Sequence, residues 1–323
     1  MILTLTLNPT VDRVLAVPGF RPGGVRRAEL LDLIPAGKGF NVSRVLAALG
    51  VPSTAAGPVG AAEIPLYRAA FGPLGVRLRL FPFPRPTRSN VTVIDPRAGT
   101  ETHLRELGPA VPAGALARLT RGLFGRSRRA AGSAGVLAFC GSLPPGMGQA
   151  GLLGALRAAR RSGRRLFVDS SGQPLRTAWR LRPEILSVNA EELAGLTGRP
   201  TDCPSAALAA ARALLVAGRG ADGPGDRLIL VKLGARGALA VGAAGAWRAI
   251  PPAIRARNTV GAGDAFNAGF LAAESRGVPA ALALAAACGA AQAASPALGR
   301  LDPARVASLA RALRVETLAG KRG

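Results

Sequence analysis

The sequence predicts an α/β protein built on a doubly wound, mostly parallel sheet. Apolar runs of strand length, such as Val136–Cys140, Leu166–Asp169 and Leu228–Leu233, alternate with longer helix-like segments. Strands this apolar are typical of parallel sheets that helices cover on both faces. Of the 323 residues, 49% are apolar, which is enough for a large core and excludes a disordered chain.

The elements can be justified in order along the chain. Ile2–Leu7 alternates apolar residues with threonine and reads as a strand that ends at Asn8-Pro9. Asn41–Leu49 follows a glycine-rich loop and stops at Gly50, which predicts a helix that Asn41 caps. The same criteria predict strands at Val91–Ile94, Ile185–Val188 and Ala238–Val241, and helices at Gln149–Ser162, Ala190–Leu196, Ser205–Val216, Asp264–Ser275, Pro279–Ala294 and Pro303–Leu313.

Two stretches, 13–35 and 84–112, interrupt this alternation. Both are rich in Pro, Gly and Arg and show little helical periodicity. We expect them to pack together as a small β lid at the sheet edge, within a single domain that spans 1–323. A lid is useful where water must be kept from a reactive phosphate.

The charge of the chain is strongly positive, with 42 basic and 18 acidic residues and a net charge of +24. Only three of the basic residues are lysines, and the basic residues scatter apart from Arg126–Arg129 and Arg157–Arg165. Aromatic residues are 4% of the chain, too few to provide stacking platforms beside these charges. A nucleic-acid partner is therefore disfavoured, although the charge alone would suggest one.

Three classes of protein can also be set aside. No segment reads as a membrane span, and the N-terminus lacks the basic region of a secretory signal. Cys140, Cys203 and Cys288 lie far apart, and the chain has one histidine, which argues against a disulfide scaffold or a structural zinc site. A cytoplasmic protein fits these features best.

The strongest chemical signal is Asn258-Thr259-Val260-Gly261-Ala262-Gly263-Asp264, which leads directly into a predicted helix. Glycines allow backbone N–H groups to converge at a helix N-terminus, where a phosphate binds well. A carboxylate beside such a pocket can take a proton from an attacking hydroxyl. The alternative is a plain turn in which Asp264 caps the helix.

A second glycine-rich segment, Ala36-Gly37-Lys38-Gly39-Phe40-Asn41, joins a close backbone approach to one positive charge. Turn chemistry alone would explain its glycines equally well. Asp12 and the Gly141–Gly146 segment follow predicted strands, and a carboxylate at a strand end suits sugar hydroxyls. Asn189 and Glu192 lie one helical turn apart, as for outer-sphere magnesium binding or for a capping box. Gly234 and Gly237 lie between two strands, in a nucleotide-binding turn or a plain hairpin.

Together these segments resemble the ribokinase-like (PfkB) carbohydrate kinases, and within them the 1-phosphofructokinase/tagatose-6-phosphate kinase branch. The resemblance runs from TLTLNPTVD through PAGKGFNV, TRSNVTV, ETHLRELGP, CGSLPPGM and NAEEL to NTVGAGDAFNAGF. It implies an ATP- and Mg²⁺-dependent kinase that converts fructose 1-phosphate to fructose 1,6-bisphosphate. Alternatives are a tagatose-6-phosphate or fructose-6-phosphate kinase, a kinase of unphosphorylated sugars, or a non-catalytic nucleotide- or nucleic-acid-binding protein.

The resemblance also implies a role for each matching residue. Asp264 would be the base, and the amides of Gly261, Ala262 and Gly263 would form the anion hole. The sugar and its phosphate would contact Asp12, Gly37, Lys38, Asn41, Arg88 and Asn90, with Arg27 as a further candidate. The nucleotide would contact Asn189, Lys232, Gly234, Gly237 and Thr259. Glu192 would bind the metal ion. A lid-mediated homodimer is implied in the same way.

Two positions depart from the pattern of that family. The family often has Lys-Pro before the asparagine, where this chain has Ser187-Val188. It often has serine where Lys232 stands. We therefore expect Lys232 or an arginine to offset the lysine that is missing at position 187.

Overall fold

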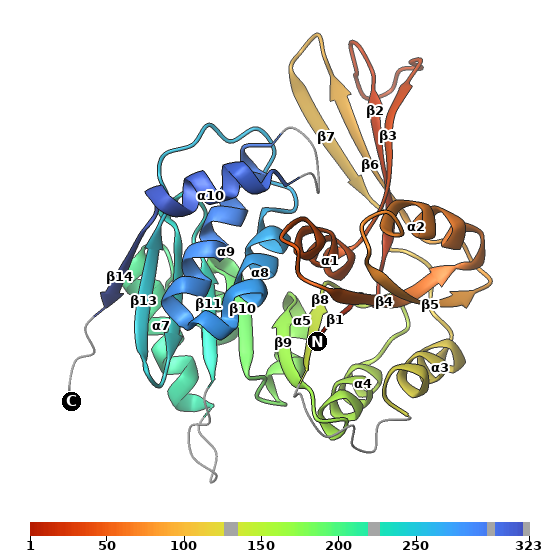
Figure 1. Ribbon diagram of the computed structural model, residues 1–323. Coiled ribbons are helices and arrows are strands. Elements are labelled where there is room, and N and C mark those ends of the chain that lie inside the picture. The colour runs from red at the N-terminus through yellow and green to blue at the C-terminus, as the bar shows by residue number, and fades with distance from the viewer. Residues whose placement is uncertain (126–134, 219–226, 296–300, 319–323) are drawn as a thin grey trace.

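The computed structural model describes residues 1–125, 135–218, 227–295 and 301–318 (Figure 1). Ten strands form one sheet in the order β14-β13-β12-β11-β10-β9-β8-β1-β4-β5. Pairing is parallel from β5 to β11 and antiparallel from β11 to β14. The strands are β1 (Ile2–Leu5), β4 (Ser53–Gly60), β5 (Arg77–Phe83), β8 (Val136–Cys140), β9 (Arg165–Asp169), β10 (Ile185–Asn189), β11 (Leu228–Lys232), β12 (Ala238–Gly242), β13 (Gly245–Ile250) and β14 (Arg314–Leu318).

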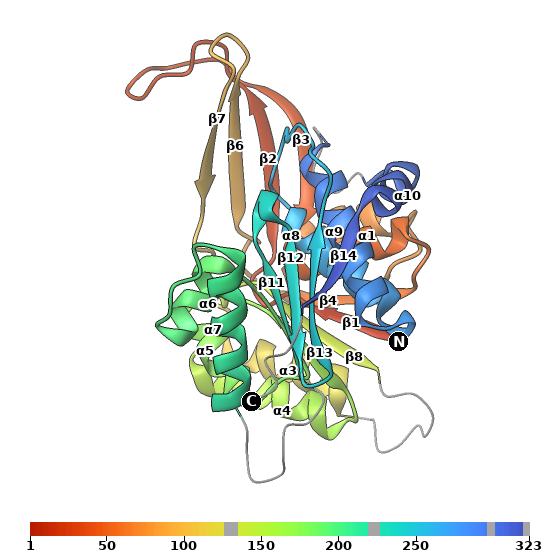
Figure 2. The same ribbon diagram turned by 90° about the vertical axis from the view of Figure 1, so that its left-hand side faces the viewer.

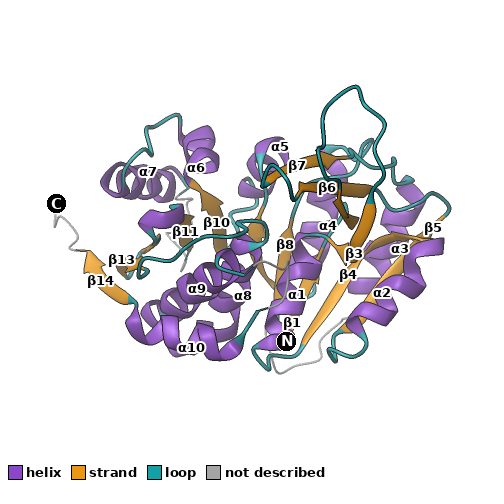
Figure 3. Cartoon of the chain, turned by 90° about the horizontal axis from the view of Figure 1, so that it is seen from above, coloured by secondary structure: helices purple, strands orange, loops and turns teal. Residues whose placement is uncertain are grey.

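Helices cover both faces of this sheet, as Figure 3 shows from above. One face carries α3 (Ala113–Phe124), α4 (Gln149–Arg161), α5 (Gly172–Trp179), α6 (Ala190–Thr197) and α7 (Pro204–Ala217). The other carries α1 (Lys38–Ala48), α2 (Ile64–Phe71), α8 (Ala262–Ala273), α9 (Val278–Ala293) and α10 (Pro303–Ala312). The predicted doubly wound, mostly parallel fold is confirmed. None of the described helices combines the length and the apolarity that crossing a bilayer requires.

The core lies in two layers because strand side chains alternate between the two faces. In β8, Leu137 and Phe139 pack with the α3–α7 layer, whereas Val136, Ala138 and Cys140 pack with the α8–α9 layer. All five side chains are buried, which explains the continuous apolar run in the sequence.

The predicted lid is a separate four-stranded sheet with the order β3-β2-β6-β7. It comprises β2 (Thr10–Ala16), β3 (Glu29–Ala36), β6 (Ser89–Asp95) and β7 (Thr100–Arg105). Figure 2 shows these strands projecting from the large sheet. At their base, the buried Tyr67 hydroxyl of α2 lies 2.8 Å from the Thr10 carbonyl oxygen and 2.9 Å from that of Ala36. Thr10 and Ala36 are paired across β2 and β3, so one phenol holds both lid strands where they join the body.

Several sequence expectations were wrong in detail. Helix α1 begins at Lys38, with Gly37 at its N-cap, so Asn41 lies one turn inside the helix and does not cap it. Asp12 lies within lid strand β2 and not at the end of the first strand. The antiparallel strand β14 was not predicted at all. The basic run Arg126–Arg129 lies outside the described residues.

Candidate functional site

The site lies beyond the carboxyl ends of the central parallel strands, where ligands bind in open α/β sheets. Asp169 is the last residue of β9, and it is paired with Cys140 at the end of β8. Asn189 and Lys232 are paired at the ends of β10 and β11. The sheet register thus brings to one end of the strands residues that are spread over positions 140–232 of the chain.

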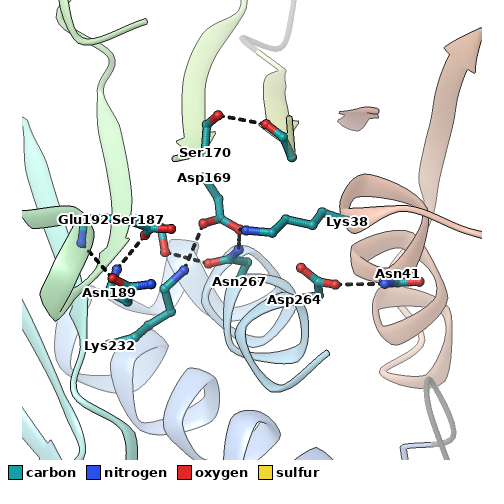
Figure 4. Close-up of polar contacts among 11 residues, drawn as sticks. Lys38, Asn41, Asp169, Ser170, Ser187, Asn189, Glu192, Lys232, Asp264 and Asn267 are labelled. Atoms are coloured by element: carbon teal, nitrogen blue, oxygen red, sulfur yellow. Dashed lines mark hydrogen bonds and ion pairs between the residues drawn. The ribbon is translucent and has the colours of Figure 1, made fainter. Parts of the chain in front are cut away.

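Asp264 lies in the first turn of α8 and is 6% exposed. Its Oδ2 accepts a hydrogen bond of 2.8 Å from Asn41 Nδ2 of α1 (Figure 4). The N-cap of α8 is Gly261, at φ 77°, and no side chain caps this helix, so the alternative in which Asp264 is a cap is not observed. Burial raises the pKa of Asp264 to about 6, although the charge of Lys38 opposes this rise.

The glycine turn before Asp264 offers fewer free amides than the sequence suggested. The Ala262 N–H donates to the Thr259 carbonyl over 3.2 Å, so it is available to an anion only if this bond opens. Lys232 Nζ lies 3.8 Å from the point where a Cβ on Gly263 would be. An anion at this turn would therefore meet backbone N–H groups and an ammonium group together.

Asp169 ties two of the three lysines of the chain to one buried carboxylate. Its Oδ1 accepts from Lys232 Nζ at 2.9 Å, and its Oδ2 accepts from Lys38 Nζ at 3.3 Å and from Asn267 Nδ2 at 2.9 Å (Figure 4). Ser187 Oγ in turn donates to Asn267 Oδ1 over 2.6 Å. Burial acts to raise the pKa of Asp169, but the two ammonium groups hold it below the ordinary value.

Sequence reasoning missed a role for Asp169 and Asn267. The only available signal for Asp169 was an acid at the end of an apolar strand. Lys38 is linked to both carboxylates, since the charge of Asp169 and then that of Asp264 raise its pKa. Asp264, Lys38 and Lys232 are therefore brought into one electrostatic cluster.

The lid side of the site begins with Asp12 and Asn90, which are paired across β2 and β6. Asn90 Nδ2 donates to Asp12 Oδ1 over 2.9 Å, and Asn90 Oδ1 is buried without a hydrogen-bond partner among the described residues. Burial raises the pKa of Asp12.

Arg88 precedes this strand and is tied to the backbone through three nitrogens. Nε donates to the Pro9 carbonyl at 3.2 Å, Nη2 to that of Asn8 at 3.1 Å and Nη1 to that of Glu106 at 2.9 Å. The predicted phosphate ligand therefore also anchors the lid to the end of the first strand. Arg27 lies in the β2–β3 connection and is exposed.

Asn189 and Glu192 form the capping box that was their alternative interpretation. Asn189 Oδ1 accepts from the Glu192 N–H, and Glu192 Oε2 accepts from the Asn189 N–H, each at 2.8 Å. Burial raises the pKa of Glu192. No hydrogen bond to the second oxygen of Glu192 is found within the described part of the chain, so the capping geometry and a metal role are compatible.

The remaining predicted residues lie in turns. Gly234 begins a short 3-10 turn between the antiparallel strands β11 and β12, so this segment is a hairpin connection. Gly237 has φ 91°, and an added Cβ would lie 2.0 Å from the Ala249 carbonyl oxygen, which requires glycine there for structural reasons. Gly37 is similar, because at φ 129° an added Cβ would lie 2.7 Å from Thr6 Cγ2. Thr259 is exposed before α8.

Comparison with known proteins shows the family of this chain. The model of the pfkB family carbohydrate kinases matches residues 6–303, a range that includes Lys38, Lys232 and Asp264. This chain belongs to that family.

Individual members of the pfkB family resemble the chain over at least four fifths of its length. A 1-phosphofructokinase from Rhodobacter capsulatus is 36% identical over 98% of each chain. The ATP-dependent 6-phosphofructokinase isozyme 2 of Escherichia coli is 30% identical over 81% of this chain and 82% of its own length. A crystal structure of E. coli phosphofructokinase-2 in complex with substrates and products superimposes with a TM-score of 0.86, at 27% identity over 96% of this chain and 98% of that one.

Proposed function

We propose that this carbohydrate kinase is an ATP-dependent 1-phosphofructokinase. It would transfer the γ-phosphoryl group of ATP to the 6-hydroxyl of fructose 1-phosphate, giving fructose 1,6-bisphosphate and ADP. The observation that carries the proposal is the buried Asp264 carboxylate, bonded to Asn41 and flanked by Lys38 and Lys232. The likeness to the R. capsulatus 1-phosphofructokinase supports this choice of sugar phosphate.

In this proposal Asp264 is the general base. It accepts the proton of the 6-hydroxyl while that oxygen attacks the γ-phosphorus, and the bond from the phosphorus to the bridging oxygen of ADP breaks. A pKa of about 6 suits the task, because the carboxylate is ionised at neutral pH and still basic enough to take a proton.

Groups at the N-terminus of α8 would stabilise the negative charge of the transferred phosphoryl group. The N–H groups of Gly261 and Gly263 at the helix N-terminus, joined by that of Ala262 when its bond to Thr259 opens, would face the phosphoryl oxygens. Lys232 lies beside the same turn and would supply a full positive charge. This is how we expect the chain to offset its serine at position 187.

The sugar would bind between α1 and the base of the lid. Asp12, Asn90 and Asn41 offer carboxylate and amide groups for ring hydroxyls, and Gly37 allows the ring to approach the backbone. Lys38 and Arg88 would bind the phosphate that the substrate already carries.

The nucleotide would occupy the β10–β12 side, near Asn189, Gly234, Gly237 and Thr259. Mg²⁺ in such sites keeps several waters and is bound by one or two carboxylates together with substrate phosphates. Glu192 fits this requirement through its second oxygen, and no group of three or more His, Cys, Asp or Glu side chains among the described residues forms an all-protein site. When bound, the ion would neutralise charge on the ATP phosphates.

An ADP-release assay over a panel of sugars tests the proposal. We expect the highest kcat/KM with fructose 1-phosphate, a lower value with fructose 6-phosphate or tagatose 6-phosphate, and a much lower value with fructose. The Asp264→Asn protein should lose a factor of about 10²–10⁴ in kcat. A preference for fructose 6-phosphate would reassign the substrate, and no turnover with any sugar phosphate would overturn the proposal.

We also propose that two copies associate through the lid in the cytoplasm. Leu30 and Leu31 of edge strand β3 are about half exposed, at 49% and 50%, which is unusual for large apolar side chains on a sheet edge. Light scattering after size-exclusion chromatography should show a dimer for the native chain and a monomer for Leu31→Asp. A monomeric native chain would contradict this proposal.

A further inference from the structure

A cavity of about 290 Å³ lies between the C-terminal end of α9, the start of α10 and the connection from β13 to α8 (Figure 1). Three arginines line it, Arg255 and Arg257 from the connection and Arg305 from the first turn of α10. Ala291 and Ala294 of the α9 end, both buried, form an apolar part of its wall. The cavity shares no described residue with the sites proposed above for the sugar and the nucleotide.

The positive charges around this cavity have no partner in the described part of the chain. There, the side chains of the three arginines make neither a hydrogen bond nor an ion pair. Asp302 is the one carboxylate among the described lining residues, and its Oδ1 accepts from the Ala304 N–H over 2.9 Å as the N-cap of α10. Positive charges around one small cavity repel one another, and an anion bound between them would remove this repulsion.

The position of Arg305 adds to this unfavourable charge. The N-terminus of a helix carries a partial positive charge, so acidic side chains stabilise the first turn and basic side chains do not. The first turn of α10 contains no acidic residue, and Arg305 lies in it. An anion in the cavity would therefore interact favourably with the guanidinium group and with the end of the helix at the same time.

The donors and charges of the cavity favour a phosphate group over a carboxylate. Each guanidinium group presents a planar fork of N–H donors, which suits bidentate bonding to phosphate oxygens. A phosphate monoester has three acceptor oxygens and a charge of about −1.5 to −2 at pH 7, whereas a carboxylate has two oxygens and a single charge. Three arginines against one aspartate leave an excess positive charge that a phosphate dianion matches. The volume lies at the lower end of the range for ligand pockets, which favours inorganic phosphate or a small phosphate ester.

The connection that carries two of the arginines leads directly into the glycine turn before α8. The backbone N–H groups of Arg257 and Asn258 donate to the Ala293 carbonyl at the end of α9, over 2.8 and 3.1 Å. Asn258 Oδ1 in turn accepts from the Val260 N–H over 2.9 Å. A ligand that binds the connection to α10 would therefore restrict a segment that ends at Gly261, where the transferred phosphoryl group is proposed to bind.

We infer that this cavity, which we call the arginine cavity, is a second anion site that binds a phosphate group, either as inorganic phosphate or on a small phosphorylated metabolite. Its occupation orders the connection between β13 and α8. The inference goes beyond the proposed function, because the ligand is neither the sugar phosphate nor the nucleotide. It also holds whichever sugar the enzyme phosphorylates.

The test compares Arg305→Gln with Arg311→Gln in the full-length protein. Both arginines are exposed on α10 and both changes remove one positive charge, but Arg311 does not line the cavity. Inorganic phosphate is titrated calorimetrically into each protein at constant ionic strength. We expect one binding step of the native protein to weaken by at least about tenfold in Arg305→Gln, as the loss of a charge-assisted hydrogen bond does. The step should be unchanged in Arg311→Gln, and both variants should unfold at nearly the native temperature.

Amide hydrogen exchange tests the effect on the connection. Exchange in residues 251–260 should slow when phosphate is added to the native protein or to Arg311→Gln, and should not change in Arg305→Gln. Glycerol 3-phosphate serves as the second probe: tighter binding than inorganic phosphate identifies an ester as the ligand, and weaker binding identifies the free ion. Equal phosphate affinities in the native protein and both variants would overturn the inference, and so would exchange in this segment that phosphate does not alter. Neither measurement requires turnover, so the result is independent of the ADP-release assay.

Discussion

Asn41 Nδ2 donates to Asp264 Oδ2 across 2.8 Å, joining helix α1 to helix α8. The two residues are 223 positions apart, and both are buried. This bond fixes the orientation of the proposed base before any substrate binds, which is a condition for efficient proton transfer.

The raised pKa of Asp264 gives a pH dependence of stability with a definite sign. The carboxyl has a pKa of 3.8 when unfolded and about 6 in the native protein, so the native state holds its proton more tightly. The contribution of Asp264 to the free energy of unfolding therefore falls as pH rises from about 4 to about 6, by up to about 3 kcal/mol. Asp264→Asn should be more stable than the native protein at pH 8 and nearly equal to it at pH 4, as measured by urea denaturation. A difference in the free energy of unfolding between the two proteins that is the same at pH 4 and pH 8 would contradict this account.

The same group should set the acidic limb of the kinetic profile. At saturating ATP and sugar phosphate, kcat should fall below a pH of about 6 as Asp264 becomes protonated. A limb in kcat that stays flat down to pH 5 would contradict the assignment of Asp264 as the base.

Neutralising Asp169 should disturb both lysines at once. In Asp169→Asn the ammonium groups of Lys38 and Lys232 lose their shared counter-charge. We therefore expect the free energy of unfolding to fall by about 2–4 kcal/mol at neutral pH. This loss is smaller than for a fully buried pair because the Lys38 side chain is 42% exposed, so solvent screens its charge. Because the native pKa of Asp169 is depressed, its stabilisation is present at neutral pH and is lost as pH falls through that pKa. Denaturation of the two proteins at pH 7 and in acid measures this; a constant difference would contradict it.

Lys232 should affect the nucleotide more than the sugar. We expect Lys232→Met to raise KM for ATP by about tenfold to a hundredfold, since a hydrogen bond to a charged group is lost, while KM for fructose 1-phosphate stays nearly constant. Lys232→Arg keeps the charge and serves as the control. Equal effects on both KM values would show that Lys232 only supports Asp169.

The capping role of Glu192 in helix α6 can be tested separately from the role of its negative charge. Glutamine preserves a capping box, so Glu192→Gln should unfold at nearly the same temperature as the native protein. If the carboxylate contacts Mg²⁺, the Mg²⁺ concentration for half-maximal activity should rise about tenfold or more, within the range seen when metal-site partners are removed. A titration of activity with MgCl₂ at fixed ATP decides this.

The close approach between neighbouring backbones can be tested at Gly57 in strand β4, which lies next to the edge strand β5. An added Cβ there would lie 2.4 Å from the Thr6 carbonyl oxygen, so we expect Gly57→Ala to lower the free energy of unfolding by about 1–3 kcal/mol. Gly154 in α4 has nothing within 4 Å of an added Cβ, and Gly154→Ala should raise stability by about 1 kcal/mol. Similar effects at the two positions would refute this account of β4.

The sequence was most informative where a residue type is tied to local backbone geometry. The glycine turn before Asp264, the capping box at Asn189 and the ends of the apolar strands could all be located without a structure. The bridge from Asp169 to Lys38 and Lys232 could not, because it depends on which strands are neighbours, and strand order is not written in local periodicity. Strand β14 was missed for a related reason: Arg314–Leu318 gains its strand partner only when β13 is already in place.

The Tyr67 hydroxyl that joins Thr10 and Ala36 has a mechanical consequence for the lid. Because this hydroxyl holds both strands at the base of the lid, β2 and β3 cannot separate there. We therefore expect the lid to move as a rigid body about this point. Ala36 is followed directly by Gly37 and Lys38, so we expect a rotation of the lid to shift the Lys38 ammonium group, which lies beside Asp169.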